Sequence, residues 1–166
     1  MKFFKLCSAF TALVFYGVAV AMFALSFANY QGVLSGNSQV ATGFEIAFGQ
    51  SKVLEDGKGL GTLFAFIFIV LGLCAAIYAI LRTVLVKSKK KKANANAKLL
   101  CACCTFVVCG IVPAVLLFLT LQTTGWAGQA SVAGKVIAET KLGVGAILAA
   151  IFSLVGAGAL GAAEIK

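Results

Sequence analysis

The chain has 166 residues, of which 61% are hydrophobic and only 11% are charged, with one proline, six cysteines and no histidine. An ordinary soluble domain is about half apolar and about a quarter charged. The composition therefore excludes a soluble domain, a disordered tail and a secreted disulfide scaffold, and it indicates a membrane protein. The formal net charge is +9, and its distribution along the chain is more informative than its size.

Four strongly apolar segments follow one another along the chain. Each has about the 20 residues needed to cross a hydrocarbon core, and a backbone in lipid must satisfy its own polar groups. The sequence therefore predicts an all-α membrane protein, a single four-transmembrane-helix bundle over residues 1–166. The predicted spans are 6–28, 60–82, 99–121 and 142–163.

The basic residues predict the orientation of these spans. The loops 29–59 and 122–141 together balance four basic residues against four acidic ones. The whole net charge therefore falls on the other side, which holds both termini and the loop 83–98. The positive-inside rule assigns that side to the cytoplasm. We expect a multi-pass protein of the plasma membrane, with both termini cytoplasmic and the two neutral loops outside.

The first span has an alternative interpretation. A basic start, an apolar segment and Ser26-Phe27-Ala28 together resemble a signal peptide with its cleavage site. The apolar core has about 20 residues, however, which is longer than the 7 to 15 that are typical of such signals. A retained membrane span is therefore the favoured interpretation.

Small residues recur every four positions along the fourth span. Close backbone approach over small residues is the usual way in which helices associate in lipid. Packing within the chain is the favoured role of this small ridge, and a homo-oligomer interface is the alternative. The ridge consists of Gly145, Ala149, Ser153, Ala157 and Gly161.

Pro113 lies in the middle of the third span. Proline has no backbone N–H, so the carbonyl of Cys109, four residues earlier, loses its usual donor. The sequence predicts a kink at this point. A tolerated proline is favoured over a gating hinge, because prolines are common in membrane helices.

The sequence offers no constellation of catalytic residues. Histidine, the commonest general base and nitrogen metal ligand, is absent, and no acidic residue falls inside a predicted span, where it would mark an ion or proton path. We expect no enzyme activity, no catalytic residue, no metal and no cofactor. Cys101, Cys103 and Cys104 cluster near the inner end of the third span. Soft-metal binding, redox sensing or acylation are the alternatives, and simple packing is favoured.

A run of lysines lies in the loop between the second and third spans. Lysines at an inner membrane surface attract anionic lipid, each by roughly 1 kcal/mol. Arginine and aromatic residues, which would read nucleic acid, are missing from this loop, so nucleic acid is not an expected partner. The predicted headgroup contacts are Lys87, Lys89, Lys90, Lys91 and Lys92.

The outward loops are the expected place for specific interactions. In ATGFEIAFGQ, the alternation predicts a short strand with Phe44, Ile46 and Phe48 on one face. A hairpin or small sheet over the bundle would fit this pattern. Trp126 in the last loop is expected at the outer interface, as tryptophans often are. Phe44, Phe48 and Trp126 are the candidate interaction residues of this cap, and packing of the cap itself is favoured over partner binding.

The topology resembles that of claudin-like and MARVEL-like tetraspan proteins, which have four membrane helices, both termini inside and a longer first outward loop. The segment TGFEIAFG also resembles a short motif in the first loop of small four-span proteins of Gram-positive bacteria. The first loop here lacks the tryptophan and the cysteine pair of claudins, so paracellular sealing is not carried over. The resemblance implies an integral scaffold or assembly role.

The sequence therefore favours a non-enzymatic tetraspan scaffold or assembly protein that acts through helix packing and its outward loops. Its expected partners are membrane lipids, other copies of itself or other membrane proteins. An oligomeric channel or small-solute transporter is the alternative. Its weakly polar path would be lined by the cysteines and by Thr11, Ser26, Thr62, Tyr78, Thr105 and Ser153.

Overall fold

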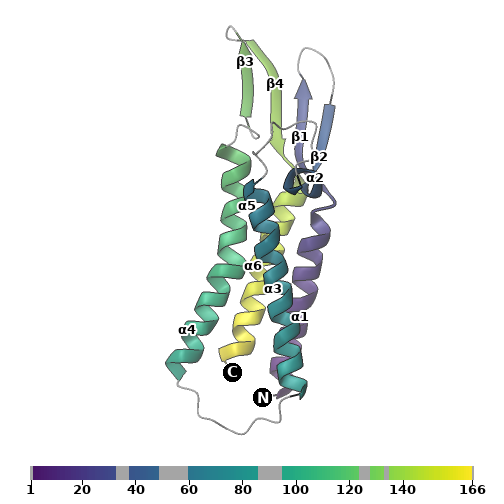
Figure 1. The fold of residues 1–166 in the computed structure, drawn as a ribbon. Coiled ribbons are helices and arrows are strands. Elements are labelled where there is room, and N and C mark those ends of the chain that lie inside the picture. Colours follow the sequence, from purple (N-terminus) through teal and green to yellow (C-terminus); the bar gives the residue numbers. More distant parts are fainter. Residues whose placement is uncertain are drawn as a thin grey trace.

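A computed structural model describes residues 2–32, 38–48, 60–85, 95–123, 128–132 and 135–165. It contains four helices long and apolar enough to cross a membrane, arranged as an elongated bundle. A small sheet stands on one end of the bundle, and both termini lie at the other end (Figure 1). The predicted class, a four-helix membrane bundle with a strand-bearing cap, is confirmed. We call the two ends of the bundle the sheet end and the terminal end.

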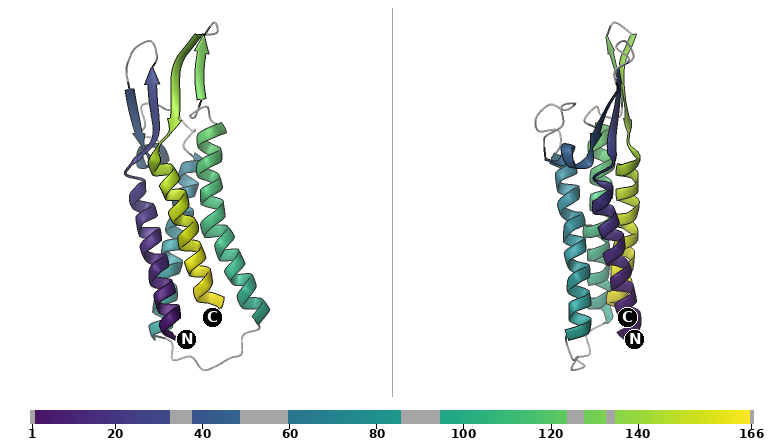
Figure 2. Two further views of the ribbon diagram at one scale, coloured as in Figure 1. Left: turned by 180° about the vertical axis from the view of Figure 1, so that it is seen from behind. Right: turned by 90° about the vertical axis from the view of Figure 1, so that its right-hand side faces the viewer.

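Long helices build the bundle, and the third span is made of three consecutive helical segments. Helix α6 lies against α1 and also against α4 and α5, while α3 packs against α1 and α5. The views of Figure 2 show these helices side by side along most of their length. Their bounds are α1 Lys2–Met22, α3 Leu60–Leu85, α4 Ala95–Phe106, the π-helix η1 Val107–Ile111, α5 Val112–Thr123 and α6 Val144–Ile165.

The third span changes its helical pitch just before Pro113. The N–H of Val112 bonds the carbonyl of Val107, five residues earlier, as a π-helix requires. Pro113 has no N–H to offer the carbonyl of Cys109, so the regular α-helical ladder cannot continue there. The third span therefore contains one π turn between two α-helices, and the kink at Pro113 stays a prediction.

The first span ends earlier than the sequence predicted. Helix α1 ends at Met22, three tight turn bonds follow, and strand β1 (Ser26–Gly32) begins. The predicted continuation of the span to residue 28 is wrong. Phe27 and Ala28 are buried where β1 meets the bundle, and their apolar character reflects that packing. Hydropathy alone does not distinguish the buried first residues of a strand from another turn of helix.

The sheet is antiparallel, with the order β2-β1-β4-β3. Its remaining strands are β2 (Ser38–Thr42), β3 (Gly128–Val132) and β4 (Lys135–Leu142). Strand β1 continues from α1 and β4 leads into α6, so the two central strands extend two helices that pack together (Figure 1). At the base of the sheet, Ala28 faces Ala41 on one side and Leu142 on the other.

The buried core runs along α1 and α6 and continues into the base of the sheet. Most of the buried residues on the long helices are alanines and glycines, which is the pattern expected for close packing in lipid. A few large side chains fill the remaining space. The largest fully buried ones include Tyr16, Phe23, Phe27, Ile46, Ile69, Leu117 and Leu160.

Candidate functional site

A short helix connects the sheet to the bundle at the sheet end. Helix α2 (Gly43–Ala47) begins with a capping box, in which the Glu45 N–H donates to Thr42 Oγ1 at 3.3 Å and the Thr42 N–H donates to Glu45 Oε2 at 2.9 Å. The predicted strand over this segment is therefore wrong. The Thr-x-x-Glu spacing satisfies two backbone donors that an isolated strand would leave open. The capping box therefore outweighs the alternating apolar pattern, and the segment is a helix.

Helix α2 rests on the turn between α1 and β1. The Gly43 N–H donates to the carbonyl of Leu25 at 3.3 Å, and the Phe44 N–H donates to that of Phe23 at 3.1 Å. A Cβ at Gly43 would lie 2.8 Å from the Phe27 ring, so the close approach requires glycine. Residues 42–48 thus hold the base of the cap on the bundle.

Five phenylalanines from three parts of the chain meet at this junction, and we call them the aromatic cluster: Phe23, Phe27, Phe44, Phe48 and Phe66. Ring centroids within the cluster lie 4.6 to 6.4 Å apart in stacked, tilted and edge-to-face pairs, a range in which aromatic pairs attract. The helical spacing leaves Phe44 and Phe48 stacked on one face, while Ile46 is buried separately. Phe44 is half-buried and Phe48 is 57% exposed.

The start of α6 crosses the start of β1 at very short range. The Gly143 N–H donates to the carbonyl of Phe27 at 2.7 Å, and a Cβ at Gly143 would collide with the Ser26 carbonyl. Two residues on, a Cβ at Gly145 would lie 2.9 Å from the carbonyl oxygens of Met22 and Ser26. This crossing fixes the central strands of the sheet relative to the two helices below them.

Tyr16 forms the polar centre of the bundle. It is fully buried, and its hydroxyl donates to the carbonyl of Cys109 at 3.2 Å. That carbonyl is the one that Pro113 leaves without its α-helical donor. A Cβ at Gly72 would lie 2.5 Å from the Tyr16 ring, and one at Gly156 would lie 3.2 Å from it. The tyrosine thus joins α1 to α3, α6 and the π turn.

The small ridge of α6 is buried inside the chain. At the sheet end Gly145 meets the α1–β1 turn, and at the terminal end Gly161 lies over Ala102 of α4, whose carbonyl oxygen is 3.5 Å from a Cβ placed there. Between them, Ala157 faces Gly110 of the π turn. The ridge residues Gly145, Ala149, Ser153, Ala157 and Gly161 therefore pack against neighbouring helices of the same chain.

Several polar side chains in the spans bond to helix backbones. Ser8 Oγ donates to the carbonyl of Ala159 across α1 and α6 at 2.6 Å, and Ser153 Oγ donates within its own helix to Ala150 at 2.8 Å. Thr105 Oγ1 lies 3.4 Å from Glu164 Oε2, which links α4 to the end of α6. Among the described residues, only the Thr62 hydroxyl is buried with no hydrogen-bond partner.

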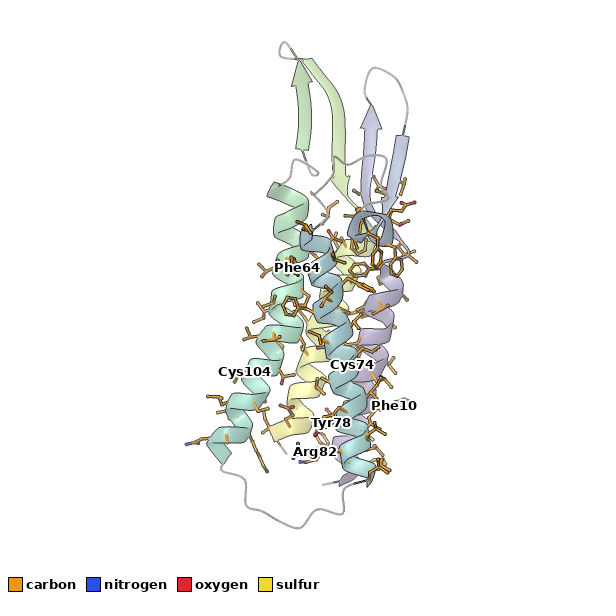
Figure 3. The ribbon with its side chains drawn as sticks, viewed as in Figure 1. Phe10, Phe64, Cys74, Tyr78, Arg82 and Cys104 are labelled. Atoms are coloured by element: carbon orange, nitrogen blue, oxygen red, sulfur yellow. The ribbon has the colours of Figure 1, made fainter. Side chains whose placement is uncertain are left out.

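The residues proposed to line a channel lie on different surfaces of the bundle. Thr62 and Ser153 are buried, whereas Thr11 and Tyr78 are exposed. Figure 3 shows Tyr78 and Arg82 on α3 toward the terminal end. In the described part of the chain these polar groups do not share one continuous face.

Five of the six cysteines are exposed and Cys109 is buried. Figure 3 shows Cys74 and Cys104 on separate helices, α3 and α4. Cys101, Cys103 and Cys104 lie within about one turn of α4. Within the described ranges, no three side chains of histidine, cysteine, aspartate or glutamate come together as a metal site.

Some predicted site residues lie outside the described part of the chain. These are Trp126, Lys87, Lys89, Lys90, Lys91 and Lys92. Of the described basic residues, Lys2, Lys5, Arg82 and Lys98 belong to the helices at the terminal end, and Lys135 and Lys141 belong to strand β4 at the sheet end.

Comparison of the chain with protein-family models, with curated proteins and with solved structures gives no match. The resemblance to claudin-like and MARVEL-like proteins therefore stays a prediction.

Sequence reasoning missed two features that organise the molecule. Tyr16 was not singled out, although it is the polar aromatic residue of the first span and Pro113 signals a free carbonyl elsewhere in the bundle. The capping box of α2 was visible as Thr42-Gly43-Phe44-Glu45, and the alternating apolar pattern concealed it.

Proposed function

We propose that this protein is a non-enzymatic membrane scaffold that acts through contacts of its sheet-bearing cap. The observation that carries the proposal is the single sheet formed by the connection between α1 and α3 and the connection between α5 and α6. This sheet is continuous with α1 and α6. A cap fixed at its base by the aromatic cluster and by the Gly143 crossing presents a rigid surface to a partner.

The proposed location is the plasma membrane, with the cap outside and both termini in the cytoplasm. The distribution of charge supports this orientation, because the described helices carry Lys2, Lys5, Arg82 and Lys98 against the single acidic residue Glu164 at the terminal end. The lysine run of the sequence adds to the same side, where anionic lipid would attract it.

Packing within the chain indicates that the cap, and not the small ridge of α6, makes the proposed contacts with partners. The small ridge of α6 is occupied by α1, α4 and the π turn, so it is not free for another copy. The proposed interactions therefore fall to the sheet end, with lipid around the exposed sides of the bundle.

The scattered polar groups give no support to the channel alternative. A path for ions or solutes needs polar groups along one face, and intramembrane charges usually mark such a path. The buried hydroxyls of Ser153 and Tyr16 are instead satisfied by helix carbonyls.

Extraction of the protein with its surrounding lipid into native nanodiscs tests the proposal. After treatment of intact cells with a membrane-impermeant amine crosslinker, we expect discrete species larger than the 17.1 kDa chain. Recovery of only the uncrosslinked single chain, at native expression and at every crosslinker concentration, would contradict the scaffold role. Ion or solute flux above that of empty vesicles after reconstitution would favour the channel alternative.

A further inference from the structure

The two outer strands of the sheet have no partner on their outer sides among the described strands. Strand β2 pairs with β1, and β3 pairs with β4. An edge strand presents a row of backbone N–H and C=O groups that can pair with another strand. The cap therefore offers two templates for strand addition, one at each edge.

The distribution of charge in the sheet is the reverse of the one that protects an edge. Natural sheets protect their edges with charged residues, proline, bulges or short strands. Neither edge strand contains a charged residue or a proline: β2 reads SQVAT and β3 reads GQASV. The charged residues of the four strands, Lys135, Glu139 and Lys141, all belong to the central strand β4. The side chain of Val40, at the middle of β2, is 58% exposed.

The two edge strands run in opposite directions relative to the bundle. Strand β1 leaves the bundle and β2 returns to it, while β3 leaves and β4 returns (Figure 1). Membrane insertion holds every copy of the chain in the same orientation. Two copies side by side therefore bring β2 of one against β3 of the next in an antiparallel arrangement. A contact between two β2 strands, or between two β3 strands, would be parallel, which is slightly less stable.

We propose that β2 of one chain pairs with β3 of a second copy, so that one antiparallel sheet continues from chain to chain. This inference rests on the proposed scaffold function and names its partner as the same protein. Because the two contacting surfaces differ, the contact is heterologous, and repetition of it gives a ring or an open row. Confinement to the membrane raises the effective concentration of copies, as tethering does, which favours a contact between two short strands.

Cysteine crosslinking tests which strands meet. All six native cysteines lie in α1, α3, α4 and η1, away from the sheet. Val40 and Ala130 are the middle residues of β2 and β3, so a membrane-impermeant thiol crosslinker of about 10 Å covers a register difference of about three residues. We expect V40C and A130C chains expressed together to crosslink to each other, and the V40C/A130C double variant to give a ladder of species.

The single variants separate the proposed contact from a symmetric one. Neither V40C alone nor A130C alone should give dimers above the background of the native chain. Dimers of V40C alone or of A130C alone, without the mixed product, would overturn the β2–β3 contact. Absence of a ladder from the double variant would also overturn it.

Charge substitution tests the same contact with a rescue. V40D/A130D places like charges on the two edges, and we expect the mean number of copies per native nanodisc, counted by stepwise photobleaching, to fall at least severalfold. V40D/A130K places opposite charges there and should restore the wild-type number. N29D is the matched control, since Asn29 is exposed and lies opposite Val40 on the central strand β1. It should leave the number unchanged.

The outcomes distinguish this inference from the function on which it rests. If V40D/A130D keeps the wild-type number of copies, the edge contact is wrong and the scaffold role stands. If the native chain is found alone and without any crosslinked partner, both are wrong. Loss of copies in both charged variants, with N29D unaffected, would show that charge complementarity does not govern the contact and would overturn the proposed pairing.

Discussion

At the scale of single residues, Tyr16 does most to connect the helices. Its ring lies between Gly72 and Gly156, and its hydroxyl donates to the carbonyl of Cys109. Two of these contacts depend on glycine, which leaves space, and one is made to the carbonyl that Pro113 leaves without its α-helical donor. The interaction therefore depends on residues from all four spans, and its strength can be measured by changing them in pairs.

The Tyr16 hydrogen bond should depend on Pro113. Y16F removes the donor and should lower the free energy of unfolding by about 1 kcal/mol. In a P113A background, the restored N–H can bond the Cys109 carbonyl, so the same change should cost much less. Unfolding in mixed detergent micelles measures both steps of this double-mutant cycle. Equal losses in the two backgrounds would contradict the assignment, and Y78F, at an exposed tyrosine, is the control.

Tight packing around Tyr16 should make Gly72 sensitive to the addition of a single methyl group. G72A places a Cβ 2.5 Å from the Tyr16 ring, and overpacking of this kind typically costs about 1–3 kcal/mol. G17A is matched to it, because nothing lies within 4 Å of a Cβ at that position. In a helix, it should be neutral or stabilising by up to about 1 kcal/mol. Thermal unfolding of the two variants in the same detergent checks the difference, and equal midpoints would refute it.

At the scale of the elements, local hydrogen bonding decides what periodicity leaves open. The segment ATGFEIAFGQ alternates as a strand does, yet the Thr42–Glu45 capping box makes it a helix. In the same way, the apolar segment of the first span continues beyond Met22, where the backbone turns and begins β1. Both differences occur at the junction of bundle and cap. Apolar residues there pack against neighbouring elements, so their spacing does not indicate whether their own segment is a helix or a strand.

The capping box should control the stability of α2. T42A removes the side-chain acceptor of the Glu45 N–H, and loss of such a cap typically costs about 1 kcal/mol. Amide hydrogen exchange over residues 43–48 should become roughly fivefold faster, since 1.4 kcal/mol corresponds to a factor of ten. T42S should keep the slow exchange. T11A, which removes a hydroxyl bonded within α1, should leave this segment unchanged, and unaltered exchange in T42A would count against the cap.

At the scale of the whole molecule, the chain is a four-helix bundle whose central helix pair continues into the sheet. Helices α1 and α6 pack together, and the strands that follow and precede them, β1 and β4, pair with each other. The first and last spans of the chain are therefore joined twice, through small residues in the bundle and through a strand ladder above it. This continuity gives the cap a fixed position relative to the membrane.

The proposed orientation can be checked directly on intact cells. In a background without native cysteines, V40C should react with a membrane-impermeant maleimide added from outside. Cysteines at positions 2 and 166 should react only after the membrane is permeabilised, because the lysine-rich side is expected to face the cytoplasm. The opposite labelling pattern would show that the cap faces inward.

The sequence by itself determined the class of the protein and the number of spans, because hydropathy and length act within a short stretch of chain. It also indicated the small ridge of α6, although not what covers it. The tertiary structure decided which helices use the ridge, where the first span ends, how the two loops join into one sheet and why Tyr16 is buried. Each of these depends on contacts between residues far apart in the chain, such as Gly143 with Phe27 and Tyr16 with Cys109, and no local pattern encodes which distant partner satisfies a polar group or fills a space.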